Sequence, residues 1–194
     1  LPASLTVLGN YAFADCTALT SIELPEGLTK IGNYAFDASG LTSLVIPSTV
    51  TSIGTNALRD TALTSFEIRA GQLTSLPGSL LSSKDIVTFT VPYGVTSLGS
   101  SFFAKAALLE TVYLPDTLTA LPASVFSGCT ALKNVYTYSL GEDGGMILRN
   151  NAEMAAGVVD ISAITTIEQS AFLEAASIQT LIFSDELTTI RKSA

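Results

Sequence analysis

Two glutamates are the first residues in this chain that could do chemistry. Glu23 and Glu67 hold the same position in two repeated apolar segments, with Val45 at that position in the segment between them. Two strand spacings would separate the carboxylates by roughly 9.6 Å, near the gap of inverting glycosidases. Their neighbours are serine and threonine, so nothing would desolvate either acid and prepare it for proton transfer. We expect both to be solvated surface groups.

Other catalytic and metal-binding motifs fail on inspection. The absence of histidine excludes Ser-His-Asp and Cys-His catalysis and histidine-ligated zinc. No Ser-x-x-Lys, Gly-x-Ser-x-Gly or Gly-x-Gly-x-x-Gly motif occurs. The Gly141–Gly145 loop has two acids but not the alternating oxygens of a calcium loop, which indicates a solvated turn. The sequence therefore predicts no catalytic residue, no metal and no cofactor, and the chain is not expected to be an enzyme.

The two cysteines, Cys16 and Cys129, hold the same position of the repeat, five repeat units apart. At ~4.8 Å per unit they would lie roughly 24 Å apart, against about 5.5 Å between the Cα atoms of a disulfide. We expect two buried free thiols that act as small apolar side chains.

Composition narrows the class of partner. Of 194 residues, 47% are hydrophobic and 13% are charged, and 17 acids against nine bases give a net charge of −8. The only adjacent basic pair is Arg191-Lys192, so nucleic-acid binding is not expected. The apolar runs are a few residues long, whereas a membrane-spanning helix needs ~20, so no membrane span is predicted.

The elements that position these residues follow from an internal repeat of 22 to 24 residues. Each unit carries L-x-x-L-x-L or an apolar variant, whose apolar positions face one way in a short strand while the others face outward. The pattern starts at eight positions, Leu19, Leu41, Leu63, Ile86, Leu109, Leu132, Ala156 and Ile178. We therefore predict eight parallel strands on one face of a solenoid.

A second pattern follows each strand, as in LPEGLTKIGNYAF from Leu24. Its proline cannot donate to a ladder and ends the strand, and a second apolar pair, such as Leu28 and Ile31, crosses the opposite wall. A glycine or proline and then a bulky residue come next. The bulky residues should stack as a continuous spine that one unit alone could not bury, and they are Phe13, Phe36, Leu58, Leu81, Phe103, Phe126 and Phe172.

The string LTSIELPEGLTKIGNYAFDAS resembles the BspA-like leucine-rich repeat, a family of bacterial and protozoan surface proteins. The likeness combines the period, the I-P step and the G-x-x-A-F step, and it covers the chain except residues 138–155. It implies that residues 1–194 form a single solenoid of the α/β repeat type. This solenoid would be right-handed and largely β, with about eight parallel strands on one face and little regular helix. The asparagine ladder of ordinary leucine-rich repeats is missing.

Residues 138–155 keep the length of a unit but lose the A-F step. Met146-Ile147-Leu148 is a strand-like apolar run, and Asn150-Asn151 is a turn signal. We predict an irregular unit, with a glycine-rich loop and a small hairpin that projects from the side of the solenoid. The family resemblance implies a similar interruption.

The outward positions of the predicted strands differ along the chain. The early ones hold mostly serine and threonine, whereas the later ones carry tyrosines and a pair of opposite charges across neighbouring strands. Exposed tyrosines are favoured at interfaces; the alternative is that tyrosine simply suits a strand and stacks along a ladder. The predicted protein-binding patch comprises Tyr113, Tyr136, Tyr138, Glu110, Lys133 and Asn134.

The resemblance also implies an extracellular or cell-surface location and the binding of a protein or other macromolecule, as in adhesion. The alternative is a passive spacer within a longer surface stalk. Leu1-Pro2 matches Leu24-Pro25, and neither end carries a polar cap. We therefore expect a fragment of a longer array that associates end to end.

Overall fold

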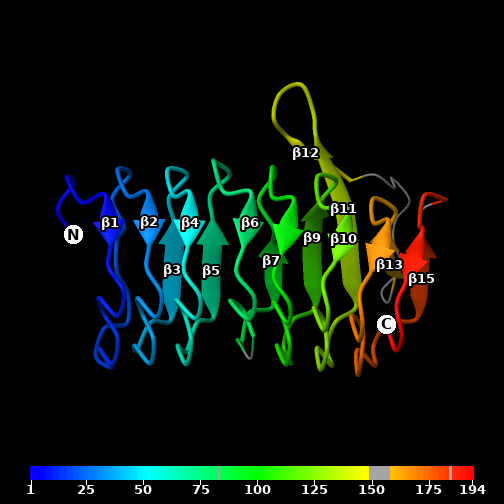
Figure 1. The fold of residues 1–194 in the computed structure, drawn as a ribbon, viewed down its shortest axis with the longest axis horizontal. Helices are drawn as coiled ribbons and strands as arrows, with labels where there is room; N and C mark the ends of the chain where they lie inside the picture. Colours follow the sequence, from blue (N-terminus) through cyan, green and yellow to red (C-terminus); the bar gives the residue numbers. More distant parts are fainter. Residues whose placement is uncertain (83, 149–157, 184) are drawn as a thin grey trace.

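The computed structural model describes residues 1–82, 84–148, 158–183 and 185–194. These residues form a β solenoid of sixteen short strands without a helix, wound from the N-terminal end to the C-terminal end in Figure 1. Successive repeat units lie side by side, and the strands of each wall pair with strands of other units. The fold is the largely β parallel solenoid that the repeat predicts.

The longer strands form one wall, which we call the front. They are β3 (Ser43–Ile46), β5 (Ser65–Ile68), β7 (Thr88–Thr90), β9 (Thr111–Pro115), β11 (Asn134–Leu140), β13 (Val158–Ile161) and β15 (Thr180–Phe183). Pairing is parallel, in the register of the repeat, as between Ser43 and Ser65. The described front wall thus has seven strands, where the sequence predicted eight. Residues 19–24 form no strand, although the Thr42 amide donates to the Thr20 carbonyl at 2.9 Å.

The opposite wall, the back, consists of two-residue strands. They are β1 (Val7–Leu8), β2 (Lys30–Ile31), β4 (Ser52–Ile53), β6 (Ser75–Leu76), β8 (Ser97–Leu98), β10 (Ala120–Leu121), β14 (Thr166–Ile167) and β16 (Thr189–Ile190). A threonine precedes each of them, and in several units its hydroxyl donates to the threonine carbonyl of the unit before. Thr29 donates to Thr6 at 2.9 Å and Thr51 to Thr29 at 3.1 Å. Threonine therefore supplies both the β-branched shape and a bond between units.

The core contains the predicted spine. Phe36, Phe103 and Phe126 are fully buried, and the Phe103 and Phe126 ring centroids lie 5.4 Å apart with nearly parallel planes. Phe13 stacks on Phe36 at 5.7 Å in the same way. Burial of each such ring stabilises the fold by roughly 2–3 kcal/mol, so the spine is a main source of stability.

A repeated backbone feature around the spine explains why it forms turns and no helix. The residues two before and two after the bulky position have positive φ, as at Tyr34 (55°) and Ala38 (51°) around Phe36. A right-handed helix cannot pass through a left-handed residue. The other positions are Tyr11, Asp15, Asn56, Asp60, Ser79, Ser101, Lys105, Ser124, Gly128, Ser170 and Glu174.

The solenoid is divided into two stacks. No pairing joins β5 to β7 or β4 to β6 in the residues that the structure describes. The link from Ile68 to Leu73 is one residue longer than the equivalent link from Ile46 to Val50. We call residues 1–70 the N-terminal stack and residues 71–194 the C-terminal stack. The front sheet of the C-terminal stack runs without a break from β7 to β15.

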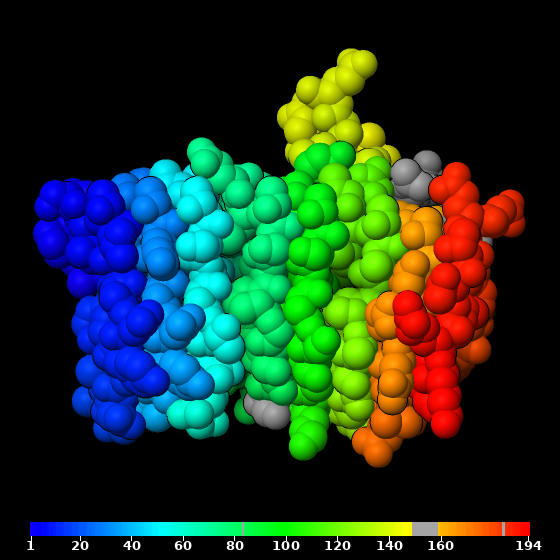
Figure 2. All heavy atoms as spheres, viewed as in Figure 1, coloured from blue at the N-terminus to red at the C-terminus, as the bar shows by residue number. Residues whose placement is uncertain are grey.

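The irregular unit adds a strand to the front wall alone. β11 continues into an antiparallel hairpin with β12 (Met146–Leu148), which projects from the solenoid in Figures 1 and 2. On the front, β11 pairs with both β9 and β13; on the back, β10 pairs directly with β14. The Phe126 ring likewise stacks on Phe172 at 5.5 Å. The predicted turn at Asn150-Asn151 lies outside the described residues.

Candidate protein-binding surface

Five of the six predicted patch residues lie together on the units of β9 and β11. The half-exposed rings of Tyr113 and Tyr136 stack with centroids 5.4 Å apart, and the two residues are paired in register. Lys133 Nζ lies 2.8 Å from the Glu110 carboxylate, and Asn134 Nδ2 donates to Thr111 Oγ1 at 3.3 Å. Partial burial and the neighbouring Tyr113 raise the pKa of Tyr136, which keeps its phenol protonated.

Tyr138, the sixth residue, does not present a contact surface. Only 3% of it is exposed, and its hydroxyl donates to the Val91 carbonyl at 2.7 Å. Strict alternation from Tyr136 would place it outward, but the alternation ends where β11 leaves the front wall for the hairpin, and Thr137 and Tyr138 are both buried. Burial raises the pKa of Tyr138 to about 12. Its inclusion in the exposed patch was wrong; it holds the base of the hairpin.

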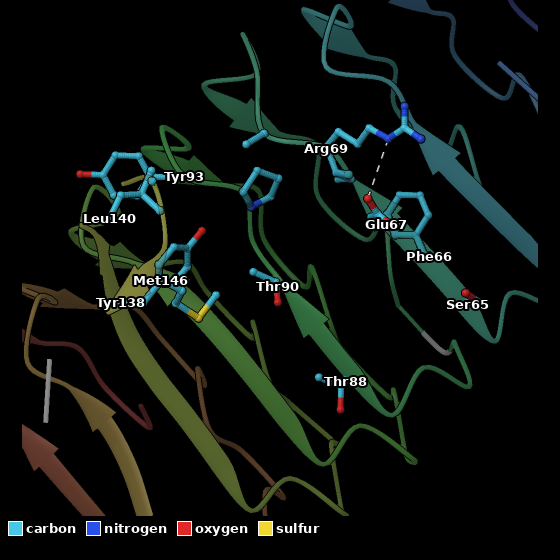
Figure 3. A pocket seen from close by; sticks show the side chains of 14 residues that line it. Ser65, Phe66, Glu67, Arg69, Thr88, Thr90, Tyr93, Tyr138, Leu140 and Met146 are labelled. Atoms are coloured by element: carbon cyan, nitrogen blue, oxygen red, sulfur yellow. Dashed lines mark ion pairs between the residues drawn. The ribbon is translucent and has the colours of Figure 1, made fainter. Parts of the chain in front are cut away.

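A hollow adjoins the patch. Its volume of about 640 Å³ is within the usual range for ligand sites. Thr88 and Thr90 of β7 lie along it, and Tyr93, Leu140 and Met146 gather at its hairpin end (Figure 3). Thr90 is paired with Tyr113, so the hollow and the patch form one continuous surface. The remaining lining residues are Ser65, Phe66, Glu67, Ile68, Arg69, Ala70, Pro92, Tyr138 and Gly144.

Sequence reasoning missed this hollow. The hollow is formed by the unpaired step between β5 and β7 together with the overhanging hairpin. These two parts are far apart in the sequence: Glu67 and Met146, which both line the hollow, are separated by more than 70 residues. One local signal was present, because Arg69 stands where the neighbouring units have proline and the link after it is longer. The Arg69 guanidinium forms an ion pair with Glu26, two units away, and its Nε lies 4.0 Å from the Glu67 carboxylate.

The groups considered for catalysis are placed as surface groups. Glu23 and Glu67 are both exposed. The Gly141–Gly145 segment closes the hairpin as a turn, in which the Gly141 amide donates to the Gly145 carbonyl at 2.8 Å. Among the described residues, no three acidic or thiol side chains are close enough to hold a metal ion. The same residues include no helix that is long and apolar enough to cross a membrane.

The two thiols are free but differ in environment. Cys129 is buried, its Sγ lies 3.0 Å from the Phe103 carbonyl, and burial raises its pKa to about 11. Cys16 is exposed, so the expectation that both thiols are buried was wrong for this residue. The cause is its place in the first described unit, which has a packed unit on one side only.

A buried lysine occupies the same position of the repeat as the cysteines. Lys84 is 4% exposed, and its Nζ donates to the Thr61 carbonyl at 2.9 Å. Burial lowers its pKa, although Asp60 opposes this. The equivalent residues in other units are small: Cys16, Ser39, Thr61, Ala106, Cys129 and Ala175. Lysine at this position was not singled out from the sequence.

The stacked units, parallel front strands and phenylalanine spine define a leucine-rich-repeat solenoid. Residues 6–133 and 102–194 match the BspA type leucine rich repeat region, in six copies. The chain belongs to this family. No curated protein sequence matches it.

One solved structure shows the same fold at low sequence identity, and a second is similar over more of the chain at a lower TM-score. A leucine-rich repeat protein from Eubacterium ventriosum is 20% identical with a TM-score of 0.57, over 84% of this chain and 47% of that one. A leucine rich cell surface protein from Faecalibacterium prausnitzii is 22% identical with a TM-score of 0.47, over 95% of this chain and 59% of that one. This chain thus spans about half the length of these proteins.

Proposed function

We propose that this chain is a protein-binding module of a surface or secreted bacterial protein, and that the front of its C-terminal stack carries the contact surface. The observation that supports the proposal is the continuity of the Tyr113 and Tyr136 rings with the hollow beside them. The surface location rests on the family resemblance. The proposed role is binding without catalysis.

The tyrosines would supply most of the affinity. Each presents a rigid ring that loses little conformational entropy on binding, and its neutral hydroxyl can donate or accept a hydrogen bond. The Glu110–Lys133 ion pair is about half exposed, so it would steer and orient a partner more than hold it. Truncation of central aromatic contacts commonly costs ~2 kcal/mol or more of binding free energy.

The N-terminal stack favours the second candidate role, that of a spacer. Its front strands β3 and β5 present mainly Ser43, Ser65, Val45 and Glu67 outward, without an exposed aromatic ring. Regular units of this kind extend a solenoid and hold the C-terminal stack at a distance. We therefore propose the spacer role for this stack alone.

The proposal can be tested by selecting ligands from a displayed library of protein fragments against the immobilised chain. Dissociation constants of the selected ligands are then compared for the native chain, for Tyr113→Ser/Tyr136→Ser, and for Val45→Ser. Val45 is the matched control, because it is exposed in the equivalent position of β3. We expect the double variant to bind at least ~30-fold more weakly, from ~2 kcal/mol lost, and the control to bind normally.

Two results would overturn the proposal. Equal losses for the double variant and for Val45→Ser would remove the patch as the contact surface. A specifically bound ligand is displaced by an excess of its own unlabelled form. If selection yields no such ligand, the spacer role would extend to the whole chain.

A further inference from the structure

The hairpin presents apolar side chains that cover nothing in the core. Leu140 is 41% exposed, Met146 45% and Ile147 49%. Leu140 and Met146 are paired across the two strands of the hairpin, and both line the hollow together with Tyr93 (Figure 3). Ile147, which follows Met146 directly, does not line it. The hollow therefore has one apolar end, formed by three side chains from two separate segments.

The surroundings of this apolar end are hydroxylated and acidic. Ser65, Thr88 and Thr90 extend the surface away from the hairpin. Glu67 stands beyond them, with its nearest base, Arg69, at 4.0 Å and already paired with Glu26. Glu142 and Asp143 are exposed in the turn of the hairpin, and the chain carries a net charge of −8. An occupant with positive charge on both sides of an apolar group would complement this pattern.

An inserted strand does not fit between β5 and β7, although the two are not paired. The Phe66 and Phe89 rings beneath them are stacked at 5.7 Å, so the units remain in contact. Room for another strand would require units roughly 9.6 Å apart, or two strand spacings. The occupant must therefore lie over the surface and be recognised through its side chains.

We propose that this hollow is the anchor pocket for a segment of a partner protein, and that it takes one large apolar side chain flanked by lysine or arginine. The apolar side chain would lie between Tyr93, Leu140 and Met146. Methionine suits such a pocket because its flexible, polarisable side chain adapts to different shapes. The flanking bases would face Glu67 on one side and the turn of the hairpin on the other. This inference rests on the proposed function and specifies its partner.

The test uses a fluorescein-labelled peptide with the sequence Ser-Lys-Arg-Leu-Lys-Ser and measures binding by fluorescence polarisation. Two companion peptides replace the leucine with serine, or the three bases with glutamine. We expect each companion to bind at least ~10-fold more weakly to the native chain. Binding of the basic peptide should also weaken as salt is raised from 50 to 300 mM, because the charges are exposed.

Two variants of the chain locate the peptide. Met146→Ser should weaken binding ~10-fold, whereas Ile147→Ser, its equally exposed neighbour, should change it less than twofold. Both side chains lie outside the core, so the thermal midpoint should be unchanged and reports that the fold is intact. Equal effects of the two variants, or equal affinity for the leucine and serine peptides, would overturn the proposal.

The outcome can be separated from that of the protein-binding proposal. If none of the peptides binds while library-selected ligands still depend on Tyr113 and Tyr136, the anchor pocket is refuted and the binding module stands. If the peptides bind as expected but no selected ligand depends on the tyrosines, the pocket stands and the tyrosine patch is refuted.

Discussion

The two stacks join their repeat units in different ways. In the N-terminal stack, polar side chains repeat one bond from unit to unit: the Asn33 amide donates to Asn10 Oδ1, and the Thr55 amide to Asn33 Oδ1, both at 2.9 Å. In the C-terminal stack, Tyr138 reaches across two units to the Val91 carbonyl, and a hairpin leaves the front wall. The N-terminal stack does expose one aromatic ring, Tyr11, which stacks on Tyr34 away from the front strands. On the front wall, however, only the C-terminal stack carries stacked tyrosines and the apolar side chains of the hairpin.

A single position of the repeat accompanies this difference. It is glycine throughout the N-terminal stack, at Gly9, Gly32 and Gly54. In the C-terminal stack it varies, with proline at Pro77 and Pro122, glycine at Gly99 and glutamate at Glu168. A Cβ atom on Gly32 would lie 2.6 Å from the Asn10 amide nitrogen, so glycine permits the close approach that the asparagine bonds need. Regular units thus extend the solenoid, whereas departures from the repeat create the candidate binding surface.

The largest effect should come from the spine, which both stacks share. Phe126→Ala and Phe36→Ala should each lower the free energy of unfolding by ~3–5 kcal/mol, because each removes a fully buried ring. The loss in unfolding free energy should be at least as large for Phe126→Ala as for Phe36→Ala, since aromatic rings stack on both sides of Phe126. Urea unfolding measures both, with Ser43→Ala as the control within ~0.5 kcal/mol. A control that lost as much as the rings would mean that inward and outward positions are misassigned.

The thiols should report the difference between an end unit and an inner unit. At pH 8, Cys129 should react with dithionitrobenzoate at least about a hundredfold more slowly than Cys16, because a pKa of about 11 leaves little thiolate. After denaturation without reductant, the thiols of Cys16 and Cys129 should both react rapidly. Comparable native rates would show that the inner units open as readily as the first.

Gly54→Ala should destabilise the N-terminal stack by about 2 kcal/mol or more. The new Cβ atom would lie 2.4 Å from the Asn33 amide nitrogen, so two units would have to separate. Gly9→Ala is the matched control, since nothing lies within 4 Å of a Cβ atom there. Thermal unfolding compares them, and equal midpoints would argue against the close approach of the units.

Tyr138→Phe should have the smallest effect, a loss of about 1–2 kcal/mol, because it leaves the Val91 carbonyl without its buried donor. The variant should also change the alkaline limb of the stability profile. The folded pKa of Tyr138 is about 12 and the unfolded value about 10, so its contribution is complete below pH 10 and is lost as pH rises toward 12. Urea midpoints between pH 9 and 11.5 should fall less steeply in the variant than in the native chain.

Periodicity was enough to predict the walls and the spine, because each unit repeats the same apolar spacing and must bury it against its neighbours. The exposure of individual side chains was harder to predict from the sequence. Cys16 and Cys129 have equivalent sequence contexts, and only their place in the stack separates an exposed thiol from a buried one. The left-handed positions near Phe36 are occupied by tyrosine and alanine, which carry no turn signal of their own.

The candidate site was partly predictable for a similar reason. Tyr113 and Tyr136 follow the regular alternation of front strands, so their outward direction could be inferred from spacing. Tyr138 could not be placed, since its burial depends on where β11 leaves the wall. The hollow depends on contacts between distant units, and spacing within a unit does not encode them.

The extra front strand also sets the course of the solenoid axis. Between β9 and β13 the front spans two strand spacings, while the back spans one between β10 and β14. With a strand spacing of ~4.8 Å and walls ~10 Å apart, this wedge turns the axis by about 25°. The front is therefore locally convex, and Tyr113 and Tyr136 stand on the crest, where both rings are open to a broad partner.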